Sequence, residues 1–405
     1  MKNYLYVFYL LVCCFILPLH SEESPFSKEY VDGSNRFAYS LFQKMQENDN
    51  ICFSPWNIST TCGLAFIGAE GTTKSQMQKT FGYPTNNNEV FCKEQSRTEA
   101  FLAPVVDSAQ AVAVQQDFAL NQSYVSHVKE KLHAELFPID LTYPNKAASM
   151  INQWVQRKTQ GHISSLVSGN DFSHYTRLVL LGTCFCKAKW AHPFEKNRTK
   201  EAPFFAANHK ELLVPMMSQQ SIMRVFQDSQ VSVVWLGCTH PDSSQAELEG
   251  IFILPSKTKE IKTLYSQDNL DVWEKSSSFD LVHFTAPKCT LRKKMELKTL
   301  LQQLGMKEAF SKAADFSLIE PAKSLLIEKI LHEAFLELDE AGITAGAATA
   351  VIMGLTSIHV PEQEPRIVRC DRPFLFLLRE KSSGLILFTS YIALPGCFNH
   401  LSMLP

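Results

Sequence analysis

Two short patterns in the sequence contain residue types that bind metals. His332-Glu333 begins like the zinc motif H-E-x-x-H, in which two histidines on one helix face hold the ion. Position 336 is Leu336, so the second histidine is absent. Cys184 and Cys186 lie inside an apolar run with one residue between them, whereas zinc-binding knuckles have about two to four. The sequence therefore predicts no metal site.

The common enzyme motifs are also absent. The chain has no G-x-S-x-G nucleophile elbow, no phosphate-binding G-x-x-x-x-G-K-[ST] loop and no G-x-G-x-x-G dinucleotide fingerprint. Its 12 histidines are scattered without the spacing of metal ligands. We expect a protein that is not an enzyme and that needs no cofactor.

One segment, from Ala341 to Ser357, contains neither a charged residue nor a proline. A stable helix would not tolerate its glycines and β-branched residues. A permanent surface loop would usually contain charges or turn residues. The segment is therefore compatible with an extended strand, and on composition alone it is either a buried strand or a flexible linker.

The composition of the 405-residue chain is that of a globular protein, with 45% apolar and 20% charged residues. Lysine and arginine number 39 against 41 aspartate and glutamate residues, so bulk positive charge does not favour nucleic acid as a partner. No linker rich in Gly, Ser or charge divides the chain, which predicts a single unit.

The N-terminus reads as a secretory signal peptide over residues 1–21. A short positive start is followed by an apolar run from Tyr4 to Leu17 and by Ser21 at the expected cleavage site. The alternative is a membrane anchor, but the run is shorter than the roughly 20 residues of a membrane span. We expect a secreted, extracellular protein without a membrane-spanning segment.

Three sequons fit this location. Asn121 and Asn197 stand among polar residues and are expected to carry glycans. Asn57 precedes an apolar helix and is expected to be buried and unmodified. Nine cysteines remain after Cys13 and Cys14 are removed, and we interpret them mainly as small core residues, with their pairing left open.

Hydrophobic periodicity places helices mainly in the first third of the chain and strands mainly in the rest. This order favours an α+β fold rather than regular βα alternation. The expected helices are Arg36–Gln46, Ile58–Ile67, Lys146–Thr159 and Glu296–Leu304, and the expected strands are Arg177–Phe185, Ala246–Leu254, Ala334–Glu340 and Phe374–Leu378.

Several motifs, in order, resemble those of the serpin family from about Phe26 to Pro395. They include FSPWNI at residues 53–58, KAKW at 187–190, VPMM at 214–217 and VRCDRPFLFLL at 368–378. Each motif alone is weak, but together in this order they identify the chain as a member of the family.

The resemblance implies a serpin fold with three β-sheets, eight or nine helices and an exposed reactive loop at about residues 341–361, in one domain over residues 22–405. Inhibitory serpins are cleaved in this loop by a serine protease, which becomes covalently acylated. The loop then inserts into the main sheet as a new strand and distorts the protease. The implied partner is therefore a serine protease, and the implied state is a monomer.

Family spacing also implies the position of the reactive bond. Glu340 matches an acid at the seventeenth position, counted back from the acyl-donating residue as the first, so the bond is Thr356-Ser357. The register could slip to Leu355, Met353 or Ile358. These residues suit a chymotrypsin-like or elastase-like pocket. The implied hinge of the loop contains Glu340, Gly342, Ile343, Thr344, Ala345, Gly346, Ala347 and Ala348.

The chain departs from the family pattern in the hinge and at the centre of the main sheet. Position 343 is usually Thr or Ser and is Ile343 here, and position 344 is usually Glu and is Thr344. In the sheet-opening region, formed by Ser54, Asn57, Trp190 and His332, the family usually has Ser at position 57 and Asn at position 182, where this chain has Asn57 and Gly182.

We expect these two central changes to compensate each other, with Asn57 bonded to His332 or Ser54; unrelated drift, with water satisfying His332, is the alternative. The bulky hinge also leaves open a non-inhibitory serpin that acts as a carrier, chaperone or storage protein.

Overall fold

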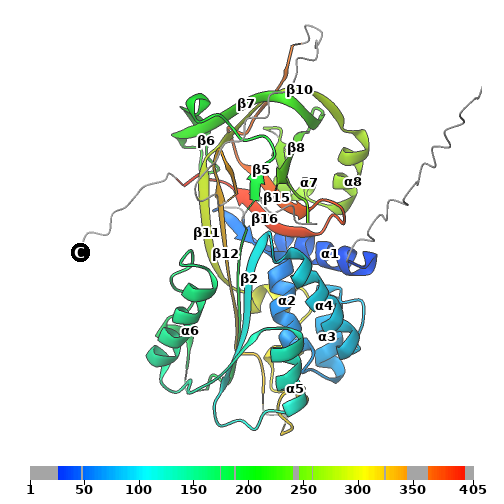
Figure 1. Ribbon diagram of the computed structural model, residues 1–405, viewed down its shortest axis with the longest axis vertical. Coiled ribbons are helices and arrows are strands. Elements are labelled where there is room, and N and C mark those ends of the chain that lie inside the picture. The colour runs from blue at the N-terminus through cyan, green and yellow to red at the C-terminus, as the bar shows by residue number, and fades with distance from the viewer. Residues whose placement is uncertain are drawn as a thin grey trace, which may run out of the picture.

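The computed structural model describes residues 26–46, 49–173, 175–186, 188–239, 246–257, 259–322, 325–343 and 364–396, so the expected signal peptide lies outside it. Nine α-helices occur in these ranges (Figure 1). They are α1 (Lys28–Lys44), α2 (Pro55–Phe66), α3 (Gly71–Phe81), α4 (Asn88–Leu102), α5 (Gln122–Ser126), α6 (Pro144–Lys158), α7 (Ile261–Leu264), α8 (Gln267–Ser276) and α9 (Lys298–Gln303).

The described ranges also contain sixteen strands, which confirms the α+β class. They are β1 (Ile51–Phe53), β2 (Val106–Gln115), β3 (Glu135–Ile139), β4 (Leu178–Cys186), β5 (Ala188–Trp190), β6 (Lys200–Phe205), β7 (Glu211–Gln227), β8 (Val231–Thr239), β9 (Leu248–Pro255), β10 (Ser278–Pro287), β11 (Cys289–Glu296), β12 (Lys329–Leu338), β13 (Gly342–Ile343), β14 (Arg366–Arg369), β15 (Phe374–Glu380) and β16 (Ile386–Ile392).

The strands pair as three sheets that are joined into one hydrogen-bonded network, as the resemblance predicts. The main sheet has the order β3-β2-β4-β12-β11, and β13 lies between β12 and β5 at one end. A second sheet follows the order β1-β16-β15-β9-β8, and a third contains β6, β7, β10 and β14. The 17-residue strand β7 pairs with β8, β10 and β6 and so joins the second and third sheets.

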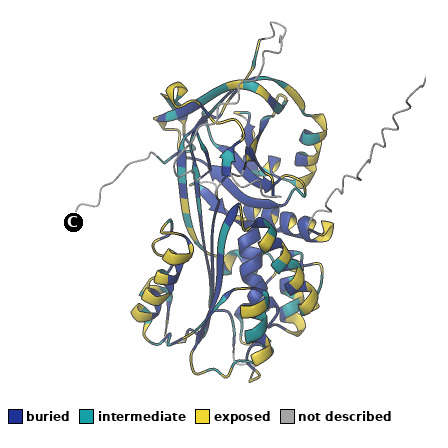
Figure 2. Cartoon of the chain, viewed as in Figure 1, coloured by how far each residue is buried: buried dark blue, intermediate teal, exposed yellow. Residues whose placement is uncertain are grey.

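Helices cover both faces of the main sheet, with α2 and its neighbours on one side and α6 on the other (Figure 1). Every residue of α2 is buried, while α6 exposes its outer side (Figure 2). Ser54 caps the first turn of α2 by accepting a hydrogen bond from the amide of Asn57, and Pro55 suits the first helical position. The covering helices explain why β4 is buried on both faces.

The structure corrects several parts of the sequence interpretation, and the strand expected at Ala334–Glu340 is β12 (Lys329–Leu338), because Asp339 begins the turn that follows it. The first third also contains β1, β2 and β3, because small apolar side chains in β2 pack between helices without a clear period of two. The helix expected at Glu296–Leu304 is confined to α9, since Glu296 ends β11 and Leu297 is the N-terminal cap.

Candidate functional site

The seam between β4 and β12 is the centre of the candidate site. These two strands are parallel neighbours, and Gly182 pairs with His332 midway along them. Ala334 pairs with Cys184 one inward-facing position further on. Both strands are held on their outer sides, β4 by β2 and β12 by β11. A new strand entering the sheet here would have to separate β4 from β12.

The chain makes a tight turn where β12 ends. The Oδ1 atom of Asp339 accepts hydrogen bonds from the amides of Ala341 and Gly342, at 2.8 and 2.9 Å. The indole nitrogen of Trp190 donates to the carbonyl of Asp339 at 2.9 Å. A Cβ atom at Gly342 would lie 2.1 Å from the carbonyl oxygen of Ala188, so only glycine fits this close approach.

The turn leads into β13, which consists of Gly342 and Ile343 alone. Ile343 pairs with Leu338 of β12 on one side and with Ala188 of β5 on the other, antiparallel to both. Its side chain is fully buried in the same hydrophobic cluster as Leu338 and Trp190. The bulky Ile343 is therefore already accommodated in the main sheet, directly in line with the seam between β4 and β12.

Glu340 is anchored beside this turn. Its carboxylate accepts a 2.7 Å hydrogen bond from the hydroxyl of Thr199 and forms a 2.8 Å ion pair with Lys288. Burial opposes ionisation of the carboxyl, but the Lys288 ammonium and the Thr199 hydroxyl together hold the pKa of Glu340 below its usual value. The charged form of Glu340 thus fixes the start of the loop to neighbouring strands.

His332 lies under the seam with both ring nitrogens paired. The amide of Ser54 donates to Nε2 at 3.1 Å, so Nδ1 carries the proton and donates to Oδ1 of Asn57, also at 3.1 Å. Burial lowers the pKa of His332 to about 3, because no acidic partner compensates for the loss of water. The neutral ring and the expected bond to Asn57 are both present.

Gly182 makes room for this arrangement. A Cβ atom on Gly182 would lie 2.7 Å from Oδ1 of Asn57 and 2.3 Å from the hydroxyl oxygen of Thr61. The amide nitrogen of Asn57 donates to the carbonyl of Thr183, so α2 is tied to β4 as well as to β12. A side chain at position 182 and the Asn57 amide exclude each other sterically.

Other predicted residues divide into two groups. Trp190 is buried beside the hinge turn, Asn197 is exposed, and Asn121 caps α5 by accepting from the amide of Ser123. Asn57 is buried, as expected for an unmodified sequon. Outside the described residues lie the reactive bond, its alternatives and most of the hinge, which are Thr344, Ala345, Gly346, Ala347, Ala348, Met353, Leu355, Thr356, Ser357 and Ile358.

The sequence interpretation missed three residues that hold the hinge, namely Thr199, Lys288 and Asp339. Nothing local in the sequence joins Thr199 or Lys288 to Glu340, because Thr199 directly precedes β6 and Lys288 connects β10 to β11, both far from Glu340 in the chain. Asp339 could have been predicted from the sequence, since Asp followed three residues later by Gly is a common turn pattern.

Cysteines and charged clusters in the described ranges do not form further sites. All eight described cysteines are buried, which confirms their interpretation as core residues. Within the same ranges there is no group of three or more His, Cys, Asp or Glu side chains placed to hold a metal ion. None of the described helices is both long and apolar enough to cross a bilayer.

Comparisons with known proteins agree with this geometry. The family model named Serpin (serine protease inhibitor) matches residues 32–395. Alpha-1-antichymotrypsin of Homo sapiens is 29% identical over 89% of this chain and 86% of its own length. Corticosteroid-binding globulin of Oryctolagus cuniculus is 28% identical over 89% of this chain and 94% of its own length.

Solved structures give the same result. A crystal structure of native protease nexin-1 with heparin superposes with a TM-score of 0.80 and 27% identity, covering 92% of this chain and all of that one. The chain belongs to the serpin family, whose members are generally protease inhibitors rather than catalytic enzymes.

Proposed function

We propose that the protein is a secreted suicide inhibitor of an apolar-specific serine protease, chymotrypsin-like or elastase-like. The serine hydroxyl of the protease attacks the carbonyl carbon of Thr356, the amine of Ser357 leaves, and an ester joins Thr356 to the protease. The single observation that carries the proposal is the pairing of β13 between β12 and β5, because it aims the loop at the seam.

The direction of β13 supports the proposed insertion. It runs antiparallel to β12 and β5, whereas β4 and β12 run parallel to each other. A strand that continued β13 down the seam would replace one parallel pairing with two antiparallel pairings. Antiparallel ladders are slightly more stable per residue. Gly342 to Thr356 is roughly 50 Å of strand at about 3.3 Å per residue, which exceeds the length of β4.

The register of β13 also specifies the inserted strand. Continued without a bulge from Ile343, Ala347 comes between Cys184 and Ala334, and both flanking strands give the same result. Thr349 comes between Gly182 and His332. The inward-facing set is Ile343, Ala345, Ala347, Thr349 and Val351. The hydroxyl of Thr349, the single one in this set, therefore comes next to Asn57 and His332, where the core is polar.

The proposed protease class follows from the loop composition. No arginine or lysine occurs between Ala341 and Pro365, so a trypsin-like pocket has no matching side chain. Alpha-1-antichymotrypsin is one of the relatives, and its name points to a chymotrypsin-type target. The apolar N-terminus supports secretion, and the sequons at Asn121 and Asn197 support a glycoprotein. We further propose a monomer with no nucleic-acid or membrane partner.

A non-inhibitory carrier is the second candidate. The observation that favours it is the full burial of Ile343. Because this hinge side chain is already packed in the core, the native loop gains less by further insertion into the sheet. Similarity to corticosteroid-binding globulin, named for a ligand, adds to this alternative.

Incubation of the full chain with chymotrypsin-like and elastase-like proteases separates the two functions. An inhibitor gives a protease adduct that survives denaturation, together with a C-terminal fragment whose mass places its first residue at Ser357. Complete cleavage in the loop without any adduct would contradict inhibition and favour the carrier. A different first residue would move the reactive bond to Met353, Leu355 or Ile358.

A further inference from the structure

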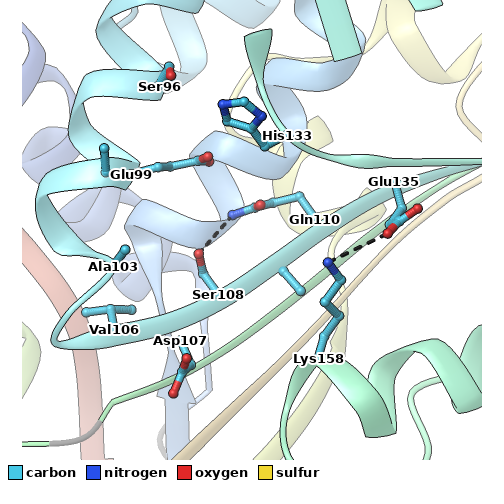
Figure 3. Close-up of a pocket in the computed structure, with 12 residues that line it drawn as sticks. Ser96, Glu99, Ala103, Val106, Asp107, Ser108, Gln110, His133, Glu135 and Lys158 are labelled. Atoms are coloured by element: carbon cyan, nitrogen blue, oxygen red, sulfur yellow. Dashed lines mark hydrogen bonds and ion pairs between the residues drawn. The ribbon is translucent and has the colours of Figure 1, made fainter. Parts of the chain in front are cut away.

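A cavity of about 310 Å³ lies between α4 and the main sheet, one strand away from the seam, because its floor strand β2 pairs with β4 (Figure 3). Ser96, Glu99 and Ala100 of α4 and its C-cap residue Ala103 form the roof of the cavity. The strand β2 forms its floor from Val106 to Gln110, and β3 and the end of α6 close the far side. Its volume suits a ligand rather than a few waters.

Glu99 is the unexplained group in this cavity. Its side chain extends from α4 toward Gln110 and His133 (Figure 3) and forms no hydrogen bond or ion pair within the described part of the chain. By contrast, the carboxylate of Glu135, which also lines the cavity, forms an ion pair with the ammonium group of Lys158 at 3.6 Å. A carboxyl that borders a cavity without a cation of its own is a ready acceptor for a positively charged ligand.

Gln110 supplies a second acceptor. Its amide nitrogen donates to the hydroxyls of Thr60 and Ser108, at 3.2 and 3.3 Å, which uses both amide hydrogens. The side chain is only 7% exposed, and its Oε1 atom has no partner among the described residues. Beside these acceptors the wall is apolar, formed by Ala100, Ala103 and Val106. The cavity thus offers hydrogen-bond acceptors next to an apolar surface.

We propose that this cavity binds a small amphiphilic primary amine, with its ammonium group on Glu99 and Gln110 and its apolar body against Ala100, Ala103 and Val106. The inference does not depend on protease inhibition. It concerns a small ligand, whereas the partner proposed for the reactive loop is a protease.

Proton release is a consequence of this arrangement. Burial raises the pKa of Glu99 to about 8, so an empty cavity holds Glu99 mostly protonated at neutral pH. The amine arrives already protonated, and its binding ionises Glu99, which releases one proton to solvent. His133, Asp107, Glu135 and Lys158 also face this space, so the proton must be assigned by substitution at Glu99.

Calorimetric titration of the full chain with phenethylamine tests the proposal. We expect saturable binding that tightens as the pH rises toward 8 and a heat that varies with the ionisation enthalpy of the buffer. Glu99→Gln should weaken binding at least about tenfold and abolish proton release. Glu94→Gln removes a carboxylate from the same helix outside the cavity and should change the affinity less than about threefold.

Two further measurements keep the test decisive. The neutral analogue 2-phenylethanol should bind at least about tenfold more weakly than the amine, because it lacks the charge. Ala100→Leu fills the apolar wall and should abolish binding while Glu99 remains. Equal binding of the amine by wild type and Glu99→Gln, equal binding of the alcohol, or no saturable binding at millimolar amine would each overturn the proposal.

Discussion

The Nδ1 atom of His332 lies 3.1 Å from the Oδ1 atom of Asn57, and this contact joins β12, at the centre of the main sheet, to α2. Asn57 also donates to the carbonyl of Thr183 on β4. One amide therefore bridges both strands of the seam from below. The space for that amide exists because Gly182 has no side chain.

The first prediction concerns the pair Asn57 and Gly182, which stand where the family usually has Ser and Asn. Asn57→Ser should lower the free energy of unfolding by about 1–3 kcal/mol, because Nδ1 of His332 loses its buried acceptor. The same variant should form loop-sheet polymers more readily. Gly182→Asn alone should also destabilise the protein, because its side chain meets Asn57.

The two substitutions together should be less harmful than their sum. Asn at position 182 could then bond His332, provided that the hydroxyl of Thr61, which has no hydrogen-bond partner, rotates away. Denaturant unfolding of the four proteins measures the coupling energy, which we expect to exceed about 1 kcal/mol. Additive effects would show that the exchange is unrelated drift.

The second prediction is a pH dependence of stability. The folded pKa of His332 is about 3, below its unfolded value of 6.5, so the unfolded state binds more protons between these values. His332 therefore leaves stability unaffected above pH 6.5 and lowers it as the pH falls, by up to about 1.4 kcal/mol per pH unit. Glu99, with its raised pKa of about 8, gives a slope of opposite sign.

Comparison with His332→Gln isolates the histidine. The difference in unfolding free energy between wild type and variant should shrink as the pH is lowered from 6.5 toward 4, since only wild type has this histidine to protonate on unfolding. A difference that is constant over this range would contradict a buried neutral His332.

The third prediction concerns the anchor of the hinge. Glu340→Gln keeps an acceptor for Thr199 but loses the charge that binds Lys288, and it should cost about 1–3 kcal/mol of stability. Amide exchange of Gly342 and Ile343 should become faster, because β13 is tied down through this residue. Glu337→Gln serves as the control, because it removes a half-buried charge from β12 that also lies near Lys288 but forms no close ion pair among the described residues. Equal exchange in all three proteins would exclude Glu340 as an anchor.

The sequence predicted the family and the α+β class, because motifs with fixed spacing carry them. It also indicated His332 as one of two expected partners of Asn57, and the structure shows that bond. It could not predict the partners of Glu340, since Thr199 and Lys288 lie in connecting segments far from Glu340 in the chain. Nor could it predict that Gly342 and Ile343 already belong to the main sheet. A strand of only two residues is too short to show a periodic pattern of side chains. The close approach of the Ala188 carbonyl to Gly342 depends on tertiary structure alone.

The fourth prediction tests the register of the inserted strand. Ala347→Arg would bring a charge between Cys184 and Ala334, where the sheet faces the apolar core, so insertion should fail and the inhibitor should become a substrate. Ala348→Arg is the matched control, because it comes level with Glu333 on the opposite face. That glutamate is buried; its Oε1 atom is paired with Arg292, and its Oε2 atom has no hydrogen-bond partner and can accept from the new arginine.

Gel electrophoresis after incubation with the target protease measures the partition between adduct and cleaved loop. We expect Ala347→Arg to lose the adduct and Ala348→Arg to retain most of it, with both proteins folded as wild type before cleavage. The reverse result would place the odd-numbered residues on the outer face and would refute the register.

The last prediction locks the seam with one substitution. Ala334 on β12 is the register partner of Cys184 on β4, and both side chains are buried in the same cluster. Neighbouring strands lie about 4.7–4.9 Å apart, which is within the range of Cα separations that a disulfide spans. Ala334→Cys should therefore allow a bond across the strands that insertion must separate. Burial raises the pKa of Cys184, so an added oxidant is needed to form it.

The oxidised variant should be cleaved by the target protease without forming an adduct, and loop cleavage should leave its melting temperature unchanged. Reduction should restore both the adduct and the rise in melting temperature, since the loop can then enter between β4 and β12. Ala334→Ser controls for the added polar atom, and peptide mapping excludes pairing of Cys184 with Cys52. An oxidised seam that still gives a full yield of adduct would rule out insertion between these strands, because a covalently closed seam cannot admit another strand.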